Sequence, residues 1–289
     1  MNIRTPVRAG SFYEGSTASC RRHAEELVSS ARLPDDLPET LYGGIVPHAG
    51  WMFSGPLAAE TMVALSESRG LETVVLFGAD HVGTVSRGEV FDSGLWRTPL
   101  GEVEIDEELA AEILQSDLCR ANPDAHAHEH SLEVQLPLLQ TINQNVKIVP
   151  VAVPPTEMAA RIGREVAQAI AQTRPGAVIV GSTDLTHHGG HFGNPGGQGR
   201  EGVRWAEEND RRMLRLIETL DADGVIPEAR NRQNACGAGA ISATIAAAKQ
   251  LGASAARVLE YTNSYQILSR QLGQSNDDTT VGYASVVFA

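Results

Sequence analysis

Short apolar runs that alternate with longer segments of helical period constrain the fold of this chain more than any other feature. The runs are rich in β-branched residues, which favour strands, and they cover residues 41–46, 73–77, 146–151, 177–181, 257–261 and 281–288. Helical periods cover residues 17–31, 56–68, 106–115, 132–142, 156–172, 201–220 and 237–250. This alternation predicts an α/β fold in which a mainly parallel central sheet is flanked by helices on both faces.

No linker-like break and no internal repeat divides the 289 residues. We therefore expect one α/β domain over residues 1–289, because folds of this class and size often have one continuous core. Such a chain buries enough surface to fold without a disulfide or a metal ion, so a metal site would serve function before stability. Residues 187–200 read HHGGHFGNPGGQGR, and the glycines predict a flexible loop near the site.

Acidic residues outnumber basic ones by 36 to 23, which gives a net charge of −13. Because this charge repels phosphate backbones and anionic lipid headgroups, we expect neither a nucleic acid nor a membrane as partner. Three cysteines without a CxxC pair indicate a reducing compartment. The first residues lack the apolar core of a signal peptide, so the expected location is cytoplasmic.

Histidines follow three of the predicted strands. His48 follows the first strand, His81 follows the second, and Asp184 and His187 follow a third. Because the carboxyl ends of parallel strands meet at one edge of a sheet, we expect these side chains to lie together. A single loop histidine is most often solvated, so the prediction depends on the repeated position. Asp184, like Asp80, would either orient an imidazole or cap the following helix.

Cys236 directly precedes an alanine-rich helical run in NACGAGAISATIAAAK. A helix N-terminus lowers the pKa of a thiol and favours the thiolate, which is both a nucleophile and a metal ligand. The alternative is a small buried cysteine that packs where Gly237 and Gly239 let backbones approach. For Cys20 and Cys119 that packing role is the preferred interpretation.

A second polar cluster precedes the helical segment at 132–142. Glu129 and His130 stand at its start and are candidate pocket residues, with Ser131 as the expected N-cap. His126 and His128 alternate with small residues, which predicts an exposed turn.

Aromatic residues occur close to the N-terminus and after the first predicted strand. Phe12, Tyr13, Trp51 and Phe53 would either form a wall for a ring-bearing ligand or pack in the core. The sequence lacks a P-loop, a GxGxxG after a strand, HExxH and GxSxG. Phosphoryl transfer, dinucleotide redox chemistry and elbow-type serine hydrolysis therefore lose their usual sequence support.

Five segments carry a resemblance to a known family: RTPVRAGSFY (4–13), PHAGWMFSG (47–55), EHSLEVQLPLLQ (129–140), STDLTHHG (182–189) and ACGAGAI (235–241). In this order, over nearly the whole chain, they resemble the motifs of the Memo family. Its prokaryotic members are often called AmmeMemoRadiSam system protein B. That name implies a functional link to a radical-SAM protein and to an AMMECR-type protein.

The resemblance implies a fold similar to that of LigB-type class III extradiol dioxygenases, which use non-haem Fe(II). It implies that His48 and His81 bind the metal and that His187, with Asp184 in the same motif, acts as acid and base. Cys236 stands where Memo proteins have a cysteine and the dioxygenases have a carboxylate ligand. This softer donor set suits copper or zinc and also holds iron.

Three functional hypotheses follow from the residues and the resemblance. The first is an oxidoreductase with a dioxygenase-like site that holds Fe(II), or alternatively copper. The second is a non-catalytic binding, scaffold or metal-buffering protein whose cleft takes a small-molecule or peptide ligand. The third is a zinc-dependent hydrolase with His187 or Glu129 as general base.

Overall fold

Four parallel strands form the centre of the sheet. In this computed structural model, which describes residues 2–273 and 279–289, they lie in the order β8 (Lys147–Ala152), β3 (Thr73–Gly78), β9 (Val178–Ser182) and β2 (Gly43–Val46). Every residue of β3, β9 and β2 is buried. Strands covered on both faces need apolar side chains throughout, which explains their continuous apolar runs.

An antiparallel group extends the sheet beyond β2. The strand β12 (Thr280–Phe288) pairs with β2 and also with β11 (Ala256–Asn263). The short strand β10 (His187–His188) pairs with the start of β12. These contacts bring the end of the chain beside its first long strand.

Short strands complete the opposite edge. Next to β8 lies β6 (Gly101–Ile105), which forms a hairpin with β5 (Leu95–Thr98), and β5 in turn pairs with β1 (Ile3–Arg4). The remaining two are β4 (Gly88–Val90), which pairs with β8, and β7 (Cys119–Ala121), which pairs with β4.

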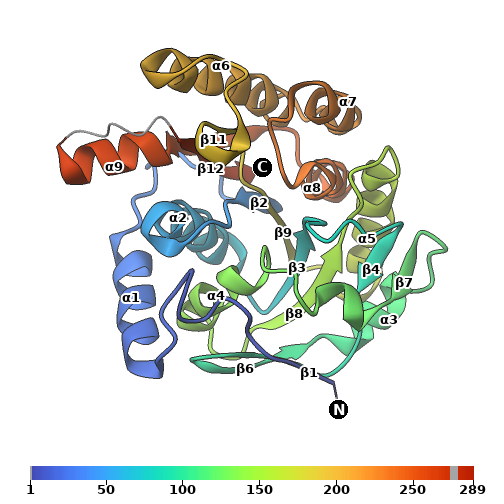
Figure 1. Cartoon of the computed structure of the whole chain (residues 1–289). Helices are drawn as coiled ribbons and strands as arrows, with labels where there is room; N and C mark the ends of the chain where they lie inside the picture. Colours follow the sequence, from blue (N-terminus) through green and yellow to red (C-terminus); the bar gives the residue numbers. More distant parts are fainter. Residues whose placement is uncertain (1, 274–278) are drawn as a thin grey trace.

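Helices cover both faces of the sheet (Figure 1). One face carries α1 (Thr17–Ser30), α2 (Trp51–Arg69) and α4 (Leu136–Ile142), and the other carries α3 (Glu107–Ile113), α5 (Ala159–Thr173) and α8 (Ala238–Leu251). Of the remaining helices, α6 (Gly199–Glu218) and α9 (Ser264–Leu272) contact β11 and β12, and α7 (Ala222–Arg232) packs against α6 and α8. Three 3-10 turns are η1 (Pro123–His126), η2 (Glu133–Gln135) and η3 (Gly190–Phe192). The predicted fold class is confirmed.

Each predicted strand is present, with bounds shifted by at most two residues. Five of the predicted helices lie near their expected bounds, and the segment at 132–142 is divided into η2 and α4. Two further helices, α7 and α9, and the short edge strands were not predicted. Residues 187–200 contain β10, η3 and the start of α6, and their flexibility stays a prediction.

The predicted start of the helix at Pro56 is wrong, because α2 begins at Trp51. Proline favours the first turn of a helix, whereas Pro56 lies beyond the first turn of α2. The backbone N–H of Trp51 instead donates to the Phe12 carbonyl at 2.8 Å, and the N–H of Ser54 donates to the Gly50 carbonyl at 3.1 Å. These bonds fix a helical turn ahead of Pro56, which lies inside the helix.

Within residues 2–273 and 279–289, no helix combines the length and the apolar character needed to cross a bilayer.

Close packing of α5 on α8 predicts the effect of a single added methyl group. A Cβ at Gly163 of α5 would collide with the backbone carbonyl of Ala243 in α8. We expect Gly163→Ala to lower the free energy of unfolding by about 1–3 kcal/mol, measured by urea denaturation. Gly176→Ala is the control, because nothing lies within 4 Å of a Cβ there. Equal stability of the two variants would contradict the role assigned to this contact.

Candidate metal centre

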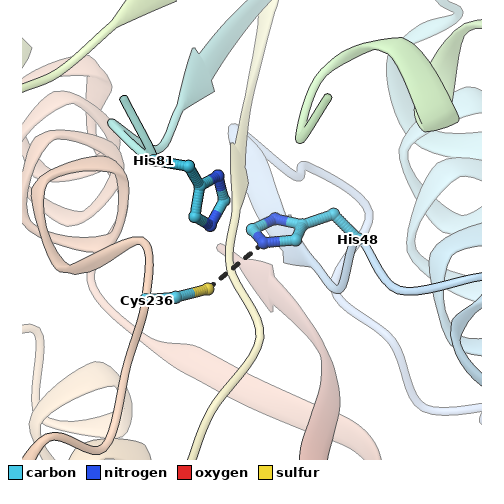
Figure 2. Close-up of side chains that lie close together, drawn as sticks. All are labelled: His48, His81 and Cys236. Carbon is cyan, nitrogen blue, oxygen red and sulfur yellow. Dashed lines mark hydrogen bonds between the residues drawn. The ribbon is translucent and has the colours of Figure 1, made fainter. Parts of the chain in front are cut away.

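His48, His81 and Cys236 meet at the carboxyl edge of the central strands. His48 follows β2, His81 follows β3, and Cys236 precedes α8. Their nearest ligand atoms all lie within 4.8 Å of one another. Figure 2 shows both rings and the sulfur directed toward a common point. The prediction that these three segments meet is confirmed. The role of these residues as metal ligands stays a prediction.

Hydrogen bonds fix the ring of His48. The Ser182 hydroxyl donates to the Ser131 carbonyl at 2.8 Å, so it has no second hydrogen for His48. His48 Nδ1, at 2.9 Å from Ser182 Oγ, must therefore carry a hydrogen and donate. Burial, and then the neighbouring His81 and His130, hold the pKa of His48 well below its ordinary value. In this neutral tautomer the Nε2 lone pair faces Cys236 Sγ at 3.2 Å.

Glu129 orients His81 from behind. One carboxylate oxygen lies 3.0 Å from His81 Nδ1, and the other accepts from the His81 backbone N–H at 3.0 Å. The backbone N–H groups of His130 and Ser131 each donate to Glu129 at 2.8 Å. Although burial opposes ionisation, His81 and these backbone donors hold the pKa of Glu129 well below its usual range. A histidine held by a carboxylate in this way presents its other nitrogen to a metal.

His81 favours its charged form in the metal-free protein. Burial works against the charge, but the hydrogen bonds to the Cys236 sulfur and the Glu129 carboxylate raise the pKa of His81 above its ordinary value. Metal binding at Nε2 would therefore displace a proton.

The predicted low pKa of Cys236 is wrong for the metal-free protein. Burial raises the pKa of the thiol above its ordinary value and outweighs the opposing effect of His81, while Asp184 raises it further. Cys236 also lies ahead of Gly237, the N-cap of α8, so it is outside the helix itself. A Cβ at Gly237 would collide with the Ser182 carbonyl, which agrees with the close packing that its sequence position suggested.

Asp184 and His187 both line the cleft beside this cluster. Asp184 neither orients an imidazole nor caps a helix, since it accepts from the backbone N–H of His48 at 2.7 Å. Burial raises the pKa of Asp184 to about 7, and burial lowers that of His187 to about 4. Asp80 accepts from three backbone N–H groups of the following loop, so it shapes that loop.

His130 stands next to the metal candidates. Its ring centroid lies 4.7 Å from that of His81 and 5.4 Å from that of His48. Burial lowers its pKa to about 4. With His81 and Glu129 it forms a second group whose ligand atoms lie within 4.8 Å of one another. His130 lines the cleft, whereas Glu129 is behind His81 and absent from the lining.

Two predictions around this segment are wrong. His126 is fully buried, because its Nε2 bonds to the Glu89 carbonyl at 2.9 Å and its ring packs against Trp96. Ser131 does not cap a helix, because its hydroxyl accepts from the Ala79 N–H at 3.2 Å. His128 is exposed, as predicted.

Six aromatic side chains line the rest of the cleft, together with smaller and polar residues, and the volume of the cleft is about 730 Å³. They are Phe12, Tyr13, Trp51, Phe53, Phe192 and Tyr283. Tyr13 and Trp51 line the cleft and also belong to the buried core, so for these two residues the ligand wall and core packing are compatible roles. Phe192 and Tyr283 were not predicted. Phe192 lies in the glycine-rich segment, which is predicted from the sequence to lie near the site. Nothing in the sequence around Tyr283 distinguishes this residue from a core residue.

Glu133 fastens the N-terminal part of this wall. Its buried carboxylate pairs with Arg4 at 2.6 Å and accepts from the Tyr13 hydroxyl at 2.9 Å. The backbone N–H groups of Val7 and Arg8 also donate to it, at 2.8 Å and 2.7 Å. The first and third family-like segments are therefore joined in space.

This chain is similar to known proteins over nearly its whole length. A family model described as Memo-like protein matches residues 4–287. A MEMO1 family protein of Methanopyrus kandleri is 37% identical over 99% of this chain and 98% of its own length. Another, of Pyrococcus abyssi, is 36% identical over 99% of each chain. A third, of Methanothermobacter thermautotrophicus, is 36% identical over 98% of this chain and 99% of its own. The chain therefore belongs to the Memo family.

Proposed function

We propose that the chain holds one metal ion between His48, His81 and Cys236 and acts as a metal-dependent redox protein. The convergence of three ligand atoms on one point, within 4.8 Å of one another, carries this proposal. Fe(II) is the proposed metal, and copper is the alternative, since two imidazoles and a thiolate suit either.

The surroundings of the ligands support this donor set. His48 already presents a bare Nε2 to the cluster, because its Nδ1–H is bound to Ser182. His81 is held by Glu129, as metal-binding histidines usually are by a carboxylate or carbonyl. These two contacts reduce the rearrangement that metal binding needs.

A redox role fits the chemistry of the cleft better than simple storage. When bound, Fe(II) would supply a centre that exchanges electrons with a small oxidisable ligand. The aromatic wall would hold a ring-bearing compound against this centre. His187, which burial keeps neutral, would accept a proton at a ring nitrogen, and Asp184 lies in the same wall.

A second candidate is recognition without turnover. The aromatic lining favours it, because six such side chains in one cleft bind a ring or an aromatic peptide without needing a metal. A chain that binds no metal after anaerobic reconstitution would favour this candidate. A chain that binds only zinc would instead favour hydrolysis or a structural site.

Removal of one ligand tests the metal site. We expect protein purified anaerobically without a histidine tag to hold nearly one iron per chain. His48→Ala should lose at least about nine-tenths of it, because two remaining ligands rarely retain a divalent metal. His128→Ala is the matched control, since that histidine is exposed and belongs to neither group of candidate ligands, although it is close in sequence to Glu129 and His130. Elemental analysis measures the metal, and equal iron in all three proteins would refute the ligand set.

Glu129 offers a subtler test of how His81 is held. We expect Glu129→Gln to weaken zinc binding about 10- to 100-fold, because the amide keeps the shape but loses the charge that orients the ring. Competition with a chromophoric chelator measures the affinity. The control is Glu25→Gln on the exposed side of α1. If both variants bind zinc as the wild type does, Glu129 has no part in holding the metal.

A further inference from the structure

A second hollow, of about 320 Å³, lies between α6 and α7. These two helices pack against each other, and α6 also contacts β11 and β12 at that end of the sheet (Figure 1). The hollow and the metal-binding cleft share no lining residue. It is therefore a separate feature of the surface, which the proposed redox function leaves unexplained.

The hollow is lined by Trp205, Glu208 and Asn209 of α6 and by four arginines: Arg211, Arg212 and Arg215 of α6, and Arg232, the last residue of α7. All four are exposed, and none forms an ion pair with any residue in the described part of the chain. Nearby Arg230, by contrast, pairs with Glu157 at 3.0 Å.

This clustering is unexpected in a chain of net charge −13. Glu208 supplies one negative charge against the four positive charges of the arginines, so the lining keeps an excess of positive charge and the guanidinium groups repel one another. The dipole of a helix attracts cations to its last turn, which accounts for Arg215 and Arg232. It does not account for Arg211 and Arg212, which lie farther from the end of α6. An anion in the hollow would offset the repulsion.

The floor of the hollow is rigid. Asn209 lines it and is buried, with 4% of its surface exposed. Its side-chain amide donates to the Arg232 carbonyl at 3.0 Å and to the Thr186 hydroxyl at 3.1 Å. The backbone carbonyl of Asn209 accepts from the side-chain amide of Asn234 at 2.9 Å. These bonds fix the end of α7 against α6 and so hold Arg232 beside the other three arginines.

We propose that this hollow binds a small compound that carries two or more phosphate groups. Guanidinium groups form paired, parallel hydrogen bonds with phosphate oxygens, and several arginines together match a multiply charged anion. The volume lies at the lower end of the range for small-molecule sites, which is about 300–1,000 Å³. A concave site of this size suits a small molecule better than a nucleic acid, which the net charge of the chain also repels.

Titration of the full chain with inorganic tripolyphosphate, followed by calorimetry, tests the proposal. We expect saturable binding that weakens as salt is added, and a loss of at least about tenfold in affinity for Arg211→Gln combined with Arg215→Gln. Arg204→Gln is the matched control, because Arg204 is exposed on the same helix but does not line the hollow. Thermal unfolding of each variant shows whether it is folded.

Three results would overturn the proposal. The first is no binding of tripolyphosphate by the wild type. The second is equal binding by all variants, which would place the anion elsewhere, such as on a metal in the cleft. The third is binding of tetraglutamate without binding of tripolyphosphate, which would identify the occupant as a carboxylate-bearing protein surface. A selective loss in the folded double variant supports the site.

Discussion

The buried Glu133 carboxylate is the interaction on which the cleft depends. An ionised carboxylate in the interior costs several kcal/mol unless donors surround it, and Arg4, Tyr13 and two backbone N–H groups do so here. Arg4 also donates to the carbonyls of His126 and Glu129. These bonds fix the N-terminal segment on the segment around Glu129, which orients His81. As a result, Phe12 of the N-terminal segment contacts His130, the neighbour of Glu129.

The fold could be predicted from the sequence where a single periodicity dominates. Central strands such as β3 are covered on both faces, so nearly all of their residues are apolar, and the run is visible without any tertiary information. Edge strands such as β1 and β5 are too short for a pattern to emerge, and they pair only because distant segments meet. The helix predicted from Pro56 begins earlier, at Trp51, where a tertiary contact to Phe12 holds its first N–H group.

The candidate site could be predicted in its membership but not in its electrostatics. His48, His81 and Asp184 follow parallel strands, so topology alone brings them to one edge. Burial cannot be read from a loop sequence, and it reverses the expected pKa shift of Cys236 and places His126 in the core. Tyr283 reaches the cleft from the last strand, and only the antiparallel pairing of that strand puts it there.

The pairing of β12 with β2 joins residues 286–288 to residues 43–45. A contact between such distant segments forms late, because a long loop must close first. During synthesis the N-terminal part of a chain emerges first, so His48 and His81 leave the ribosome well before β12 does. Until the last strand inserts, the two histidines lie in a sheet with an open edge and a cleft without its Tyr283 wall. The cleft is therefore complete only once β12 has joined the sheet beside β2.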